Sequence, residues 1–166
     1  MPVYFLYQEG HGPDRIKIGR ARRVEERRRQ LQTGNPDRLK LVGFINADDD
    51  ARLERDLHRH FAEVRGEFGE WFNLQPADVL PVLQRFHGDA FVGKTADAFE
   101  IVGYDRDGIP EHVGVWEWGD LSLEECCPFC GCLGGLHFQE ASWMYHCLAC
   151  DTLTNFEDDT RTAPEP

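Results

Sequence analysis

The chain has 166 residues and a formal net charge of −12 at pH 7, and 41% of its residues are hydrophobic. This length and composition are typical of one medium globular domain or two small ones. No apolar stretch approaches the roughly 18 residues of a membrane span and the N-terminus shows no export signal, so we expect a soluble, cytoplasmic protein without a membrane partner.

The charge is distributed unevenly along the chain. Residues 1–75 carry a net charge of +1, and the remainder carries −13. Within the first part, residues 20–40 hold eight Lys or Arg residues against three acidic ones. Because the acidic residues lie elsewhere, the overall charge does not exclude a nucleic-acid partner for the N-terminal part.

The first 45 residues alternate between strand and helix patterns. Residues 3–7 alternate along the strand period and predict a first strand, and residues 15–18 predict a second strand after a loop rich in turn formers. Residues 23–32 predict a helix that ends at Thr-Gly-Asn-Pro. Residues 39–45 are apolar on both faces, which predicts a strand in the interior of a sheet.

The pattern then changes to helices. Three consecutive aspartates, residues 48–50, offer caps for a helix over residues 50–65, and residues 77–86 predict another helix. Between them, residues 70–72 form a short extended piece that returns to the sheet. We therefore expect residues 1–88 to form an α+β domain, in which a small three-stranded antiparallel sheet is flanked by helices.

The second half divides into three segments. Residues 89–120 form a connecting segment, in which residues 99–104 and 113–118 predict a β-hairpin. Residues 121–154 hold all six cysteines. Residues 155–166 form an acidic tail that we expect to be disordered.

The cysteine-rich segment has the spacing of a metal site. Two C-x-x-C pairs are separated by 16 residues, and their members are Cys127, Cys130, Cys147 and Cys150. Each pair can wrap one side of an ion, so that four thiolates close a tetrahedron around a single structural Zn²⁺ and leave no open position for catalysis. The segment resembles a zinc ribbon. The alternative is a set of buried free thiols or a redox pair.

Four more residues of this segment are further candidate ligands: Cys126, Cys132, His137 and His146. Of these, His146 lies beside Cys147 and can replace one of the four cysteines as a ligand. Because zinc supplies much of the folding free energy of such small modules, we expect a chelator to unfold residues 121–154 and to leave the N-terminal domain folded.

Several residues of the N-terminal part carry groups suited to phosphodiester chemistry. Arg27 shares a helix face with Val24 and Leu31, so its guanidinium needs an anion, either a phosphate or an internal carboxylate. Glu54 lies at the edge of the apolar stripe of its helix, where a carboxylate can hold one Mg²⁺. The alternative for Glu54 is a solvated glutamate that pairs with a neighbouring arginine.

Three further positions leave alternatives open. Tyr4 and Lys17 lie on neighbouring predicted strands and point away from their apolar neighbours, although Lys17 can equally be an exposed strand lysine. His58 lies one turn after Glu54 and either orients it, contacts phosphate or is a satisfied histidine at the edge of the core.

The order of these signatures resembles the GIY-YIG nuclease superfamily, in its phage and bacterial branch, which is often labelled only as a DNA-binding domain. The signatures are Pro2-Val3-Tyr4, Lys17-Ile18-Gly19, Arg27, Glu54 with Leu57-His58, and Gly69-Glu70-Trp71-Phe72. They cover the first half of the chain. Lys17 stands where the superfamily usually has tyrosine, and the glycine of the first motif is missing.

The resemblance implies a DNA endonuclease that uses one Mg²⁺ or Mn²⁺ ion on Glu54. Tyr4 would stand beside the attacking water, while Arg27 and Lys17 would neutralise charge in the transition state. Glu70 and Asn73 are alternative occupants of the polar position in the last motif. Arginines of the basic segment would contact flanking phosphates: Arg20, Arg22, Arg23 and Arg28.

Two other functions remain open from the sequence. The first is a DNA-binding protein of the same fold with weak or no turnover, as the substitution at Lys17 and the missing glycine indicate. The second is an adaptor, in which the zinc ribbon or the acidic segment binds a protein partner.

Overall fold

The computed structural model describes residues 1–10, 12–67, 69–93, 101–108, 110–112, 118, 121–122 and 125–154. The predicted acidic tail and most of the predicted strand at 113–118 lie outside these residues. None of the helices in the described ranges is long and apolar enough to cross a membrane.

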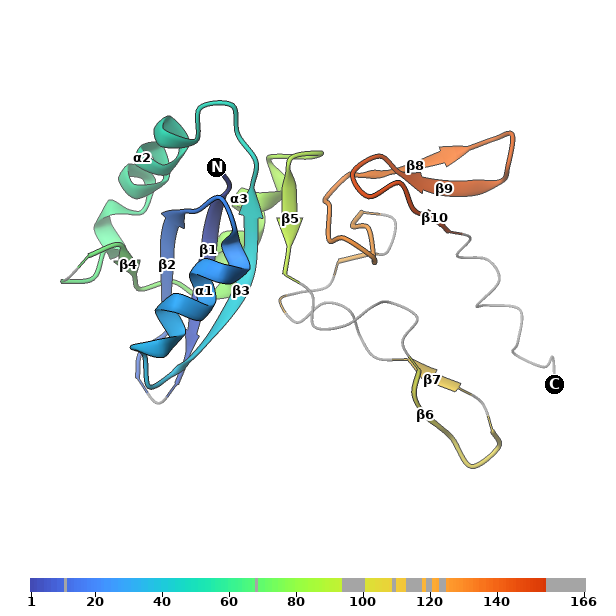
Figure 1. The fold of residues 1–166 in the computed structure, drawn as a ribbon, viewed down its shortest axis with the longest axis horizontal. Helices are drawn as coiled ribbons and strands as arrows, with labels where there is room; N and C mark the ends of the chain where they lie inside the picture. The colour runs from blue at the N-terminus through green and yellow to red at the C-terminus, as the bar shows by residue number, and fades with distance from the viewer. Residues whose placement is uncertain are drawn as a thin grey trace.

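The N-terminal part folds as a mixed α+β unit around an antiparallel sheet (Figure 1). The sheet has five strands in the order β4-β2-β1-β3-β5, so the predicted sheet type is confirmed but the predicted number of three strands is wrong. The strands are β1 (Val3–Glu9), β2 (Arg15–Arg20), β3 (Arg38–Ile45), β4 (Trp71–Phe72) and β5 (Ala90–Val92).

Both edge strands are short. β4 corresponds to the extended piece at residues 70–72 that was expected to return to the sheet, whereas β5 was not predicted. β4 pairs with β2 through Ile16–Phe72 and Lys17–Trp71, and β5 pairs with β3 over three residues. Strands of two or three residues are too short to show the alternation of polar and apolar side chains. Their position is set by pairing with strands far away in the sequence, which the local sequence does not show.

Helices cover both faces of the sheet. α1 (Val24–Thr33) lies on one face, and α2 (Asp50–His60), the 3-10 turn Ala62–Val64 and α3 (Pro76–Gln84) belong to the other (Figure 1). Alternation along β1 sorts its side chains: Tyr4 and Leu6 pack beneath α1, while Val3 and Phe5 join the larger core.

The helix ends follow from local chemistry. Asp49 caps α2 by accepting a hydrogen bond of 2.9 Å from the backbone N–H of Arg52. α3 begins with Pro76 and a capping box between Gln75 and Asp78. These caps place α2 and α3 at the positions from which their buried residues reach the sheet.

The second half contains two smaller sheets. β8 (Leu136–Gln139), β9 (Met144–Cys147) and β10 (Leu153–Thr154) form one antiparallel sheet in the order β10-β9-β8. β6 (Ile101–Tyr104) and β7 (Pro110–His112) form a hairpin. The sequence pattern predicted the second strand of this hairpin from residue 113 onward, but in the structure this strand is Pro110–His112.

The cysteine-rich segment is attached to the edge of the five-stranded sheet. Phe91 of β5 pairs with Cys132, and the backbone N–H of Val92 donates to the carbonyl of Gly131 at 2.8 Å. Gly131 has φ of 81°, and a Cβ at this position would lie 2.3 Å from the carbonyl oxygen of Val92. Leu133 is 1% exposed and belongs to the main core. The segment after the first cysteine pair thus continues the sheet beyond β5.

Candidate functional site

Tyr4 lies at the centre of the candidate site. It belongs to the middle strand and is 2% exposed beneath α1. Burial raises the pKa of the phenol above its ordinary value of 10, although a hydrogen bond from Arg27 and the charge of Arg27 act in the opposite direction. The phenol is therefore protonated near neutral pH and can donate a hydrogen bond.

Arg27 brings its guanidinium to this phenol from α1. The residue as a whole is exposed, and its Nη1 also lies 3.4 Å from Oε1 of Gln30. Among the described residues, no carboxylate forms an ion pair with Arg27. The positive charge of Arg27 is therefore held beside Tyr4 and remains open to an external anion.

Lys17 is buried, which excludes the alternative of an exposed strand lysine. It is 9% exposed, and its ammonium pairs with Glu70 at 3.0 Å and lies 5.7 Å from the ring centre of Trp71. The charge of Glu70 also raises the pKa of Tyr4, so this carboxylate belongs to the same electrostatic environment. Asn73, the other candidate for the polar position, is exposed and lines a separate cleft with Arg15 and Arg65.

Glu54 points toward the site and not into bulk solvent. Its side chain is 15% exposed, and one of its oxygens accepts a hydrogen bond of 2.6 Å from Nε of Arg20. The same guanidinium pairs with Asp50 at 3.0 Å, and Asp50 also pairs with the N-terminal amine of Met1. The charge of Glu54 raises the pKa of Tyr4, so carboxylate and phenol are neighbours.

This network changes the interpretation of Arg20. The basic segment led us to expect a phosphate contact at Arg20, but its guanidinium is engaged by two carboxylates within the protein. Their hydrogen bonds and charges raise the pKa of Arg20 still further, with Glu54 as the larger cause. Nothing in the sequence indicated Asp50 as a partner, because the two residues are 30 positions apart.

His58 lies at the edge of the core. Its Nε2 lies 3.1 Å from the carbonyl oxygen of Ile18, and its ring packs 5.2 Å from the ring of Phe72. Of the roles left open by the sequence, the contacts favour a histidine that ties α2 to β2.

The other predicted phosphate contacts differ in their surroundings. Arg23 pairs with Glu26 at 2.6 Å, and Arg28 pairs with Glu25 and donates to the carbonyl of Leu39. Within the described part of the chain, and besides Arg27, three exposed arginines of α1, α2 and the loop before α1 have no carboxylate partner: Arg22, Arg29 and Arg55. The sequence singled out only the first of these three.

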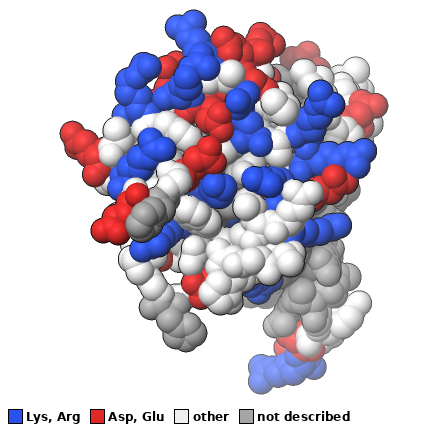
Figure 2. Space-filling view, turned by 60° about the vertical axis from the view of Figure 1, so that its left-hand side comes forward, with Lys and Arg blue, Asp and Glu red and all other residues white. Residues whose placement is uncertain are grey.

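A shallow cleft lies beside Arg27 at the beginning of α1. It is lined by Ala21, Arg22, Arg23, Glu26, Arg27 and Gln30. Figure 2 turns the side of α2, β4 and β2 toward the viewer and shows many Lys and Arg side chains on this face, with acidic side chains between them. The face is mixed in sign, and its unpaired arginines provide the available positive charge.

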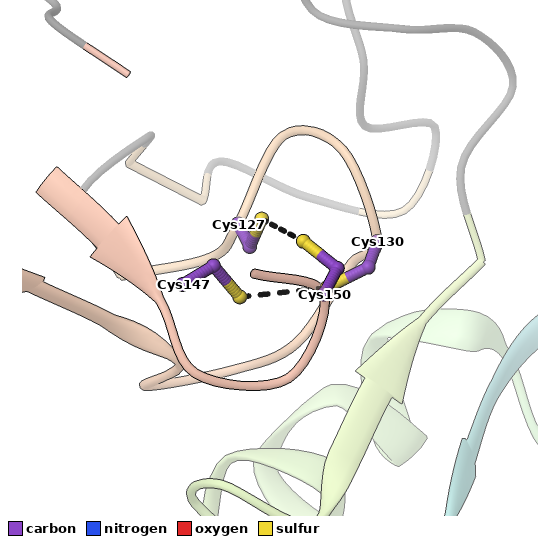
Figure 3. A group of neighbouring side chains, drawn as sticks. All are labelled: Cys127, Cys130, Cys147 and Cys150. Atoms are coloured by element: carbon purple, nitrogen blue, oxygen red, sulfur yellow. Dashed lines mark hydrogen bonds between the residues drawn. The ribbon is translucent and has the colours of Figure 1, made fainter. Parts of the chain in front are cut away.

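The four cysteines of the two C-x-x-C pairs converge at a second site (Figure 3). Their sulfur atoms all lie within 4.8 Å of one another, and Cys127–Cys150 and Cys130–Cys147 are 3.8 Å and 3.7 Å apart. Sulfurs at about 2.3 Å from a tetrahedral zinc ion lie about 3.8 Å apart. In the described residues this is the one group of at least three metal-ligating side chains. The geometry can hold a metal such as zinc.

The thiols of this cluster titrate differently. Burial raises the pKa of Cys127 and of Cys130. Burial also acts to raise the pKa of Cys150, but hydrogen bonds with Thr152, Cys147 and Cys130 together outweigh it and lower the pKa to about 7. Because thiolates are the zinc ligands, binding releases protons from the buried thiols.

Comparison with known protein families identifies the domain in the N-terminal part of the chain. Residues 1–87 match the family model of the T5orf172 domain. The chain belongs to the T5orf172 domain family. No curated protein and no solved structure matches it.

This match corrects the resemblance drawn from the sequence. The T5orf172 domain is a phage-associated domain and a different family from GIY-YIG, so the predicted membership is wrong. The resemblance depended on isolated residues in short elements, and both Lys17 and the residue before Val3 already departed from it. The family indicates a nucleic-acid-binding or nuclease-like role and gives no specific activity.

Proposed function

We propose that the T5orf172 domain binds DNA through the face formed by α1, β2 and the loop between them. The observation that carries this proposal is the arrangement at Tyr4, where a protonated phenol and the guanidinium of Arg27 lie side by side without a carboxylate between them. The guanidinium of Arg27 is exposed and can donate hydrogen bonds to a backbone phosphate, while the buried phenol of Tyr4 holds it in position.

The neighbouring charges support the same function. Arg22 lines the cleft beside Arg27, and Arg29 and Arg55 are exposed on the two helices. An arginine without a carboxylate partner within the protein can bind phosphate at little cost in free energy, because no ion pair has to be broken first. DNA binding of this kind depends on phosphates and not on base sequence. It weakens as the salt concentration rises, because the release of counterions from DNA then contributes less to the free energy of binding.

A first prediction concerns Arg27→Gln. This variant should weaken binding of a duplex oligonucleotide about tenfold, because it removes a charge-assisted hydrogen bond to phosphate. It should also reduce the slope of log K against log salt by about 0.9, the value for one lost phosphate contact. Fluorescence anisotropy of a labelled duplex at several salt concentrations measures both quantities.

The matched control is Arg85→Gln. Arg85 follows α3, which belongs to the opposite face of the sheet, and it is exposed like Arg27. Its replacement changes the net charge equally and should leave the affinity within twofold of wild type. An equal loss in both variants would show that only net charge matters and would contradict the proposed face.

Phosphodiester hydrolysis at the same site is a second candidate. The specific observation in its favour is that the carboxylates of Glu54 and Glu70 both lie near enough to Tyr4 to raise its pKa. Since the phenol is protonated, Tyr4 would orient water or a phosphate oxygen by donating a hydrogen bond, and would not act as a phenolate base. A Mg²⁺ or Mn²⁺ ion on Glu54 would stabilise charge on the attacking and leaving oxygens.

The position of Arg20 sets a condition for this second candidate. Arg20 neutralises the carboxylate of Glu54, so a cation binds there more readily when Arg20 transfers its hydrogen bonds to a bound phosphate. Binding of DNA and formation of the metal site would then occur together.

A second prediction follows for catalysis. If the domain is a nuclease, wild type nicks supercoiled DNA with Mg²⁺ or Mn²⁺, and Arg27→Gln lowers the rate by about 10²–10³. Glu54→Gln should abolish nicking and leave duplex binding in place. Identical background nicking by wild type and Glu54→Gln would exclude hydrolysis at this site and leave the DNA-binding proposal standing.

The cysteine cluster is proposed to hold one structural Zn²⁺. All four ligands come from the protein, so no position remains for substrate.

A further inference from the structure

A separate groove runs between α1, β3 and the cysteine-rich segment. One wall is formed by α1, the floor by β3, and the other wall by the end of β5, Trp118 and Cys130. Its lining combines three cationic residues, Arg28, Arg38 and Lys40, and one acidic residue, Glu25, with apolar groups at the floor. It shares no lining residue with the cleft beside Arg27, although its Leu41 and Phe44 pack in the same apolar cluster as Tyr4.

Two aromatic groups in the groove are fixed in position. Trp118 donates a hydrogen bond of 3.1 Å from Nε1 to the carbonyl of Leu41, and its ring packs edge-on against Tyr7 at 5.6 Å. Phe44 stacks on Phe91 with ring centres 4.8 Å apart and an interplanar angle of 8°. Rings that are already anchored lose little conformational freedom when a flat ligand packs against them.

The cationic side chains are partly fixed as well. The side chains of Arg28 and Lys40 are 29% and 17% exposed, and they pair with Glu25 and Glu9. Both carboxylates are about half exposed, at 52% and 47%. The Arg28–Glu25 pair is partly exposed, so a phosphate can replace Glu25 at little cost, whereas Lys40 is more buried and its ammonium also lies 5.8 Å from the ring centre of Trp118.

Arg38 adds a third positive charge. It is exposed at the beginning of β3, and among the described residues it has no carboxylate partner. A groove that offers aromatic surface between cationic side chains fits unstacked bases joined by phosphates, whereas the bases of a duplex are inaccessible to such stacking.

We propose that this groove binds single-stranded nucleic acid, with bases against Trp118 and phosphates at Arg28, Arg38 and Lys40. This inference rests on the proposed function, because it gives the same domain a second nucleic-acid contact. Neighbouring residues of α1 serve the two contacts: Arg27 reaches Tyr4 of β1, and Arg28 reaches Leu39 of β3. A single strand that crosses α1 is held on both sides of the helix.

The test uses the full chain and a fluorescently labelled oligothymidylate of roughly ten nucleotides. Arg38→Gln should reduce the salt slope of single-strand binding by about 0.7, the value for one phosphate contact on a single strand. Trp118→Ala should weaken binding about tenfold, and Trp118→Phe should retain most of it because a stacking surface remains. Arg85→Gln is the charge-matched control, and thermal unfolding identifies any variant that has lost its fold.

Duplex binding by the same preparations separates the two proposals. A reduced salt slope of single-strand binding in Arg38→Gln, with duplex binding retained, supports the groove. Wild-type binding to both nucleic acids, with single-strand binding unchanged in Arg38→Gln and in folded Trp118→Ala, overturns the groove and leaves the proposed function intact. Failure of the wild type to bind either nucleic acid overturns both.

Discussion

At the scale of single residues, the position of the Tyr4 hydroxyl depends on the absence of a side chain opposite it. Tyr4 pairs with Gly19 across β1 and β2. A Cβ at Gly19 would lie 2.7 Å from the hydroxyl oxygen and 2.9 Å from the adjoining ring carbon of Tyr4. The phenol therefore occupies the space that any other residue at this position would fill.

Gly19→Ala should consequently destabilise the protein by about 1–3 kcal/mol, because the added methyl group overpacks a buried ring. Removing the hydroxyl in Tyr4→Phe should restore part of this loss in the double variant. Gly34→Ala is the matched control, since a Cβ there meets no atom within 4 Å. Denaturant unfolding measures all four proteins, and equal stability of Gly19→Ala and Gly34→Ala would contradict the packing at Tyr4.

The sequence indicated which residues belong to the candidate site better than it indicated which residues they contact. Tyr4 and Arg27 were joined only through the family resemblance, because strand alternation and helix spacing do not tell which face of the sheet the helix covers. The pairing of Arg20 with Glu54 could not be predicted, since it joins β2 to α2 across 34 residues. The same applies to Lys17, whose ammonium pairs with Glu70 from the segment before β4, 53 positions away.

At the scale of elements, the longer strands and helices were predicted closely. The patterns at residues 3–7, 23–32 and 39–45 correspond to β1, α1 and β3, because each has a clear period or a clear terminator. β5 was missed, and it is the strand that joins the sheet to the cysteine-rich segment through Phe91 and Cys132.

This connection changes the expected effect of zinc removal. Leu133 and Cys126 are fully buried in the main core, and the backbone N–H of Leu133 donates to the carbonyl of Ala90. A chelator, or the double variant Cys127→Ser, Cys130→Ser, should therefore also destabilise the sheet, by about 1.5–3 kcal/mol if Leu133 leaves the core. The earlier expectation that the N-terminal domain is unaffected no longer follows.

Zinc analysis and thermal unfolding of the full chain measure this effect. Cys132→Ala is the matched control, because it removes a buried thiol near the cluster that is not one of the four ligands. It should keep one zinc per chain. Full zinc content in the double variant would refute the metal site, and unchanged unfolding of the sheet after zinc loss would refute the connection.

At the scale of the whole molecule, the distribution of charge matters more than its sum. The net charge of −12 would oppose DNA binding if it were spread evenly, but residues 1–75 carry +1, and four of the described arginines without a carboxylate partner, Arg22, Arg27, Arg29 and Arg55, lie on α1, α2 and the loop before α1. The segment from 121 to 154 contains no Lys or Arg, so it does not extend this face by charge. The acidic residues can instead disfavour contacts that place DNA elsewhere on the protein.

Hydrogen–deuterium exchange of the full chain, with and without a duplex oligonucleotide at low salt, tests the location of DNA most directly. The account predicts slower exchange of backbone amides in α1 and in the loop before it when DNA is present, with α3 unchanged as an internal reference. Protection confined to α3 or to the cysteine-rich segment, with α1 unaffected, would contradict the proposed DNA-binding face.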